Sequence, residues 1–129
     1  MTPLKIVFHG QNATNFRRGF EQMIEPAHTI VDLGDALSAP SEAEQYASAD
    51  VIVGIKLDAS LPRPRKLRLY QAPAAGTDAI DVSLLPPSSA LCNCHGHEDA
   101  IAEYVFAALL SRHVPLVQAD ADLRRGQWT

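Results

Sequence analysis

The sequence lacks the features that are typical of membrane-spanning, secreted, disulfide-rich, low-complexity or nucleic-acid-binding proteins. Its longest apolar stretch, residues 104–110, is far too short to span a bilayer, and no apolar signal region opens the chain. Two cysteines provide no disulfide framework, and the nine prolines form no low-complexity tract. The formal net charge of −4 gives no electrostatic attraction to nucleic acid or to an anionic membrane. We therefore expect a cytoplasmic protein that binds neither nucleic acid nor a membrane.

The 129 residues are enough for one domain, and 47% of them are hydrophobic, which allows a substantial core. Short apolar runs of strand length alternate with stretches of helical period. The five expected strands cover residues 4–8, 29–33, 51–55, 67–71 and 90–94. Alternation of strands and helices predicts an α/β fold, in which helices cover a parallel sheet.

Two helices are expected between the first strands. The apolar residues of the first recur at helical spacing and are Phe16, Phe20, Met23 and Ile24. Pro26 is predicted to end that helix, because proline cannot donate the next helical hydrogen bond. The second helix is predicted to begin at a capping box, in which the Ser41 side chain and the Glu44 carboxylate satisfy each other's backbone N–H groups.

The period becomes helical again from Glu98 to the end of the chain. One face of this segment is apolar and consists of Ile101, Val105, Ala108 and Leu109. Pro115 must break or kink the helix, and Gly126 is expected to cap its end. Because this stripe has no partner within the segment, we expect it to pair with a second copy and form a homodimer.

A series of motifs follows in order between residues 67 and 128. The loop Ala74–Asp81 reads AAGTDAID, the next short strand runs into Asn93, the following helix carries Ala102-Glu103, and RRGQW ends at Trp128. Together these motifs resemble the D-isomer-specific 2-hydroxyacid dehydrogenase family, whose members use NAD or NADP. The resemblance implies an oxidoreductase that interconverts a small D-2-hydroxy acid and its 2-oxo acid.

The resemblance also implies a domain organisation. Residues 1–97 correspond to a portion of a flavodoxin-like substrate domain, and residues 98–129 to an interdomain helical segment that would lead into an NAD(P)-binding domain. None of the seven glycines lies two positions from another, so the G-x-G-x-x-G dinucleotide fingerprint is absent. The family's catalytic arginine, glutamate and histidine also have no counterpart here. We therefore expect no catalytic residue and no bound cofactor on this chain alone.

The resemblance further assigns residues to a binding site. The backbone N–H groups of Ala75 and Gly76 would bind the substrate carboxylate, the alternative being a plain strand-to-turn connection with glycine at positive φ. Gly54 occupies a position where relatives specific for phosphorylated acids carry arginine. Lys56 would place a positive charge near the site, or is simply solvated. Ile101 is expected beside the cofactor, or is merely part of the apolar stripe.

The run CNCHGH at residues 92–97 suggests a zinc site, because thiolate and imidazole are good zinc ligands. Its spacing matches no common zinc pattern, and a period of two would place both cysteines on one strand face, where thiols pack well. We therefore expect no metal. His9, His28 and His113 have no acidic or nucleophilic partner in the sequence, so structural or exposed roles are expected for them.

Three functions compete on this basis. The first is a dehydrogenase portion that is inactive alone. The second is a stand-alone binding or interaction protein that kept the substrate-domain fold and pairs through its terminal helix. The third, a receiver or flavodoxin module, is the least favoured, because the first strand ends in His9-Gly10 without an acidic cluster and residues 10–15 form a poor phosphate loop.

Overall fold

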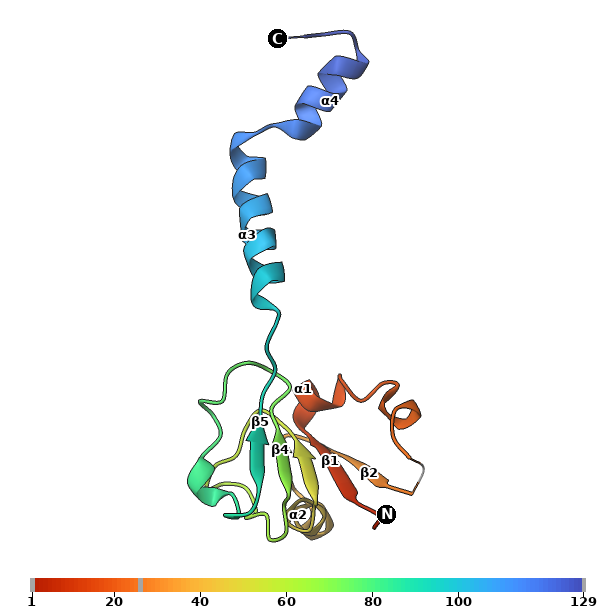
Figure 1. Cartoon of the computed structure of the whole chain (residues 1–129), viewed down its shortest axis with the longest axis vertical. Helices are drawn as coiled ribbons and strands as arrows, with labels where there is room; N and C mark the ends of the chain where they lie inside the picture. Colours follow the sequence, from red (N-terminus) through yellow and green to blue (C-terminus); the bar gives the residue numbers. More distant parts are fainter. Residues whose placement is uncertain (1, 26, 129) are drawn as a thin grey trace. The chain divides into compact units, whose positions relative to one another are not determined.

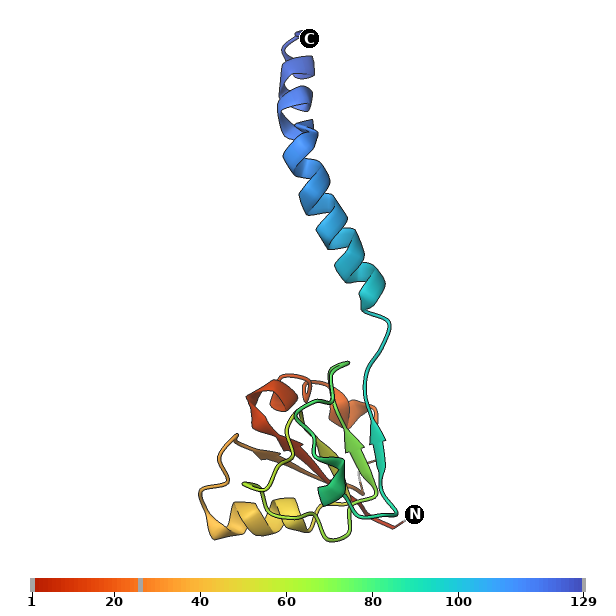
Figure 2. The ribbon, with the colours of Figure 1, turned by 90° about the vertical axis from the view of Figure 1, so that its left-hand side faces the viewer.

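The computed structural model describes all residues except 1, 26 and 129. The chain divides into two compact units, Met1–Cys94 and His95–Thr129. The first holds a sheet with its covering elements, and the second consists of two helices (Figures 1 and 2). The assignment of these parts to a substrate domain and an interdomain segment stays a prediction, and each unit is described separately.

The sheet confirms the predicted α/β fold. Its strands are β1 (Lys5–His9), β2 (Thr29–Leu33), β3 (Val51–Val53), β4 (Leu69–Gln71) and β5 (Ala90–Cys92). All neighbouring strands are parallel, in the order β2-β1-β3-β4-β5. Each expected strand is present, and the last three are shorter than predicted: β3 and β5 end two residues early at the carboxyl edge, whereas β4 begins two residues late.

Both faces of the central strands are covered, as a parallel sheet requires. Alternation along a strand sends neighbouring side chains to opposite faces, so Val7 belongs to one cluster while Ile6 and Phe8 belong to the other. The first cluster packs against Tyr46 of α2 (Pro40–Ala47). The second packs against Ala13 of the short helix α1 (Gly10–Thr14). These two clusters form the core of the first unit.

The helix predicted from the spacing of four apolar residues is wrong. The segment forms α1 and a separate 3-10 turn, η1 (Phe20–Gln22), and Gly19 between them has a φ of +82°, which interrupts an α-helix. Phe20 packs edge-to-face on Phe8 with ring centroids 5.2 Å apart, whereas Phe16 and Met23 are exposed. The predicted end at position 26 lies outside the described residues.

The predicted capping box at α2 is also wrong, although a carboxylate does cap this helix. The helix begins at Pro40, whose fixed φ suits the first helical position. The carboxylate of Glu42 accepts the backbone N–H of Ala39 at 2.9 Å. Glu44, which was expected to take this role, instead forms an ion pair with Arg65.

The second unit contains α3 (Glu98–His113) and α4 (Leu116–Arg124), which confirms the predicted break at Pro115. Gly126 follows α4 with a φ of +73°, in agreement with its predicted capping role. Neither helix contains a buried residue. The predicted single apolar face is incomplete, because Tyr104, Phe106 and Leu110 are also large, apolar and exposed.

Among the described residues no single helix is long and apolar enough to cross a membrane. Only α3 and α4 counted together reach such a length and composition, and they are bent by 54° at the break between them.

Candidate functional site

The carboxyl edge of the sheet contains the point at which strand order reverses. The chain goes from β1 outward to β2, then returns to β3 on the other side of β1 and continues to β4 and β5. In open α/β sheets ligands bind at this edge, beside such a reversal. Loops that follow β3, β4 and β5 all meet this edge, so residues from distant parts of the sequence come together there.

The loop after β4 is held on one side by the chain that follows β5. The Ala72 N–H donates to the Cys92 carbonyl at 2.8 Å, and the Cys94 N–H donates to the Ala74 carbonyl at 3.1 Å. The side-chain amide of Asn93 donates from Nδ2 to the Ala75 carbonyl at 2.8 Å. Successive carbonyls of this loop are therefore engaged on the β5 side.

The two N–H groups predicted to bind carboxylate are free to do so. The Ala75 and Gly76 amides donate no hydrogen bond to any residue that the structure describes. Ala75 is half-buried and Gly76 is exposed. The alternative that Gly76 serves a positive φ is wrong, because this glycine is not in the left-handed region. A Cβ at Gly76 would meet only the Asp78 carboxylate, at 3.4 Å.

Lys56 lies one residue from the point where the loop after β3 touches the loop after β4. Leu57 forms an isolated parallel bridge with Ile80 there. The Lys56 ammonium pairs with the Asp58 carboxylate at 2.9 Å. Ser60 and Lys56 hydrogen bond to Asp58 and lower the pKa of this exposed carboxyl to about 2. The Lys56 charge is thus matched locally, and its proposed role toward substrate stays a prediction.

Gly54 has a packing reason to be glycine. A Cβ at this position would lie 2.9 Å from the Tyr70 hydroxyl oxygen. That hydroxyl donates to the Lys56 carbonyl at 2.7 Å and holds the chain as it leaves β3. A larger residue at position 54 would have to displace this contact.

His9, at the end of β1, is a buried polar residue at this edge, which agrees with the structural role that is one of the two expected for it. It is 4% exposed, and its ring lies edge-to-face against Tyr46 with centroids 4.9 Å apart. Burial lowers the pKa of His9, an effect that the neighbouring Asp35 opposes and Lys56 reinforces. His9 Nε2 has no hydrogen-bond partner within the described part of the chain.

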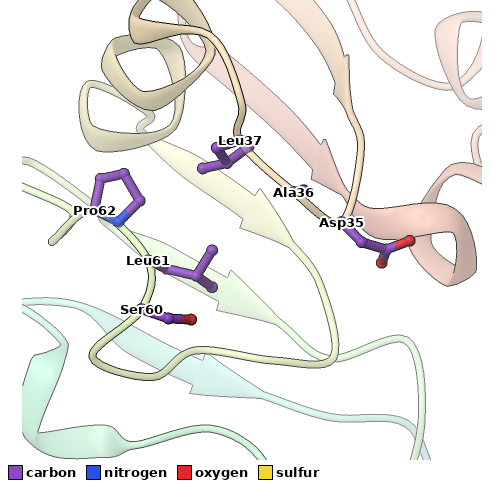
Figure 3. Close-up of a pocket in the computed structure, with 6 residues that line it drawn as sticks. All are labelled: Asp35, Ala36, Leu37, Ser60, Leu61 and Pro62. Carbon is purple, nitrogen blue, oxygen red and sulfur yellow. The ribbon is translucent and has the colours of Figure 1, made fainter.

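An open pocket of about 610 Å³ lies between the loops that follow β2 and β3 (Figure 3). Its lining residues are Asp35, Ala36, Leu37, Ser60, Leu61 and Pro62. The side chains of Leu37 and Leu61 point toward one another, whereas the Asp35 carboxylate points away from them. Polar groups do not converge in this pocket, so the loop after β4 is the better candidate for recognising an acid.

The remaining candidate residues are the two cysteines, His28 and Ile101. Cys92 and Cys94 are exposed free thiols, so the prediction that they pack on a strand face is wrong, because β5 is an edge strand that ends at Cys92. No group of three metal-ligating side chains occurs within the residues that the structure describes. His28 accepts the Leu4 N–H at 3.2 Å, which fits a structural role. Ile101 is an exposed residue of α3.

No family model matches the sequence, and no curated protein matches it either. A similar solved structure is that of a D-isomer specific 2-hydroxyacid dehydrogenase family protein from Aeromonas salmonicida subsp. salmonicida A449, with a TM-score of 0.66 and 21% sequence identity. The likeness covers 99% of this chain and 41% of that chain, so this chain spans about two fifths of its length. At this identity the likeness establishes the fold: a five-stranded parallel α/β sheet followed by helices.

Proposed function

We propose that this chain is the N-terminal, substrate-binding part of an NAD(P)-dependent oxidoreductase that interconverts a small D-2-hydroxy acid and its 2-oxo acid. The order of motifs between residues 67 and 128 supports this proposal, as does the similarity to the Aeromonas salmonicida protein along 99% of the chain. The observation that carries it is the pair of free N–H groups on Ala75 and Gly76 at the ligand-binding edge of the sheet.

Two successive N–H groups suit a carboxylate better than a neutral group. Each can donate to one carboxylate oxygen, and a hydrogen bond to a charged group contributes about 1.5–3 kcal/mol. A carboxylate held at Ala75 and Gly76 fixes the position of the adjacent C2 atom relative to the sheet edge. The loop therefore binds and orients the acid, while the paired Lys56 contributes a weaker, longer-range attraction.

NAD(P) supplies hydride transfer when it is bound to a member of this family. The residues of this chain do not fit such a cofactor, because no two glycines are spaced as the pyrophosphate-binding turn requires. We therefore propose that this chain does not form the pyrophosphate-binding turn, and that Ile101 of α3 is its contact nearest to the bound cofactor. The chain by itself is expected to be inactive. A cytoplasmic location belongs to the same proposal and agrees with two free thiols.

Nuclear magnetic resonance of the 15N-labelled chain tests this proposal. Glyoxylate should shift the Ala75 and Gly76 amide protons downfield in a saturable manner, while glycolaldehyde, which has no carboxylate, should not. NADH should neither bind nor be oxidised. Equal responses to the two aldehydes, or responses confined to other residues, would overturn the assignment.

Two substitutions at one position make the test sharper. Gly76→Pro removes the N–H group and should abolish the Gly76 half of the carboxylate site. Gly76→Ala keeps the N–H, and its added Cβ meets only the Asp78 carboxylate at an ordinary 3.4 Å, so it should bind glyoxylate as the natural chain does. Equal binding by both variants would exclude the Gly76 N–H as a ligand.

A stand-alone interaction protein is the second candidate. It is favoured by α3, which exposes large apolar side chains such as Tyr104, Phe106 and Leu110 around its circumference. A helix that is apolar on all sides is normally buried against other elements. In this case the occupant is a second copy, giving a homodimer through the C-terminal segment. Concentration-dependent dimerisation in sedimentation equilibrium, with no response to glyoxylate, would favour this function over the first.

A further inference from the structure

We infer that Asn93 is a positioning residue that aims the Gly76 N–H at the ligand, an inference that rests on the proposed binding of carboxylate by Ala75 and Gly76. The side-chain Nδ2 of Asn93 donates to the Ala75 carbonyl at 2.8 Å. This bond joins the end of β5 to the loop after β4, across a sequence separation of 18 residues.

The geometry of the peptide bond links the hydrogen bond from Asn93 to the orientation of the Gly76 N–H. The Ala75 carbonyl and the Gly76 N–H belong to the same planar peptide group, which is trans, so they point in opposite directions. Holding the carbonyl toward β5 therefore holds the N–H away from it. If this peptide flipped, it would present the carbonyl oxygen to the bound carboxylate, and two electron-rich oxygens would repel each other.

The preceding peptide is fixed in a different way. The Ala74 carbonyl accepts the backbone N–H of Cys94 at 3.1 Å, and this bond orients the Ala75 N–H. A backbone donor is present whatever the side chain at position 94. One half of the carboxylate site thus depends only on the path of the main chain, while the other half depends on the amide side chain of Asn93.

This difference predicts separate responses from two adjacent amides. Asn93→Asp replaces the donor with a carboxylate that repels the Ala75 carbonyl, and Asn93→Ala removes the donor without adding charge. Both variants should reorient the Gly76 N–H and leave the Ala75 N–H in place. A residue that only stabilises the fold would alter both amides together, or neither.

Residual dipolar couplings of the full chain test the orientation directly, because they report the direction of each N–H bond without any ligand. In both Asn93 variants the coupling of Gly76 should change while that of Ala75 stays as in the natural chain. Asn15→Asp, which changes an exposed asparagine of the same unit, is the matched control and should change neither. If Asn93→Asp does not fold, Asn93→Ala supplies the result.

Glyoxylate titration of the same samples completes the test. Binding should weaken about tenfold in the Asn93 variants, the equivalent of one charged hydrogen bond, with the Ala75 amide still responding and the Gly76 amide silent. An unchanged Gly76 coupling, or a changed coupling with unchanged affinity, would overturn the positioning role. Failure of the natural chain to respond to glyoxylate would instead overturn the proposed function, while the couplings still decide how the Gly76 peptide is held.

Discussion

The two units of this chain use apolar residues in opposite ways. In the first unit, Met1–Cys94, called the sheet unit below, the side chains of Val7, Ile52 and Tyr70 are completely buried. The second unit, His95–Thr129, is called the helical unit. In the helical unit Ile101 is 56% exposed and Tyr104 76% exposed, although both belong to a strongly apolar helix. An apolar sequence therefore does not by itself bury a side chain, because burial also needs another element that covers it. The sheet unit supplies its own cover, whereas the cover for the helical unit must come from outside that segment.

The sheet unit buries its own apolar side chains, because alternate residues of its strands pack into two separate clusters. The helical unit does not bury its apolar side chains, since its two helices, separated by a break at Pro115, contain no buried residue. Exposed apolar side chains of this kind support the proposal that this unit associates with a second copy. We therefore propose that the first unit recognises the ligand and that the second unit mediates association.

The largest expected difference between the units comes from matched isoleucine substitutions. Ile52→Ala should lower the free energy of unfolding of the sheet unit by about 2–5 kcal/mol, because it leaves a cavity among buried side chains. Ile101→Ala should change it by less than about 0.5 kcal/mol, since that side chain is outside the sheet core. Urea unfolding followed by near-ultraviolet circular dichroism of the buried tyrosines provides the measurement. Equal losses would contradict the division.

Glycine substitutions should show the next largest effect. Gly10 has a φ of +86°, and an added Cβ would lie 2.6 Å from the Asp35 carboxylate oxygen. Gly10→Ala should therefore destabilise the sheet unit by about 1–3 kcal/mol. Gly126 also has a positive φ but nothing near its missing Cβ, so Gly126→Ala should fray α4 and leave sheet unfolding unchanged. Thermal unfolding of both variants distinguishes these outcomes, and an undiminished melting temperature for Gly10→Ala would refute the overlap.

The strands of the fold were predictable because each is a short apolar run, and apolar residues in runs of this length favour a buried strand. The first helix was not, because spacing alone does not reveal that Gly19 adopts a positive φ. The start of α2 was misplaced since Pro40 favours the first helical position and moves the cap to Glu42. The errors in the first helix and at the start of α2 therefore came from the local conformation of single residues. The parallel sheet was predicted correctly because it follows from the alternation of strands and helices.

The candidate site was predictable only in part. Ala75 and Gly76 stood out through a motif that is continuous in the sequence. The hydrogen bond from Asn93 could not be read in the same way, because it depends on the parallel register of β4 and β5. Burial of His9 depends likewise on Tyr46, which reaches it from α2. Both features arise from contacts between elements that are distant in the sequence, so the pattern of residues alone does not predict them.

A smaller effect should separate the two glutamates near the start of α2. Glu42→Ala removes the carboxylate that accepts the Ala39 N–H and should cost about 0.5–1 kcal/mol. Glu44→Ala, its control, breaks an exposed ion pair with Arg65 and should cost between about 0 and 1 kcal/mol, at the lower end in salt. Urea unfolding at two salt concentrations is the measurement. A loss for Glu44→Ala that exceeds that for Glu42→Ala would place the cap where the sequence first suggested it.

The smallest expected effect is a pH dependence confined to the sheet unit. Burial lowers the pKa of His9 below its ordinary value of 6.5, so the unfolded chain binds the proton more readily than the folded chain. Stability from this group is complete above pH 6.5 and is lost as pH falls from there toward the lowered pKa. The melting temperature should decline over that range, less so in His9→Gln. His113→Gln, in the helical unit, is the control, and an identical slope in His9→Gln would exclude His9 as the cause.

Hydrogen exchange of the full chain, measured across a range of protein concentrations, tests the division between the units most directly. Amides of β1, β3 and β4 should be protected to the same degree at every concentration, because their cover belongs to their own unit. Amides of α3 should exchange quickly in dilute solution and become protected as the concentration rises and a second copy covers the helix. Protection of α3 that matches the strands and does not change on dilution would contradict the account.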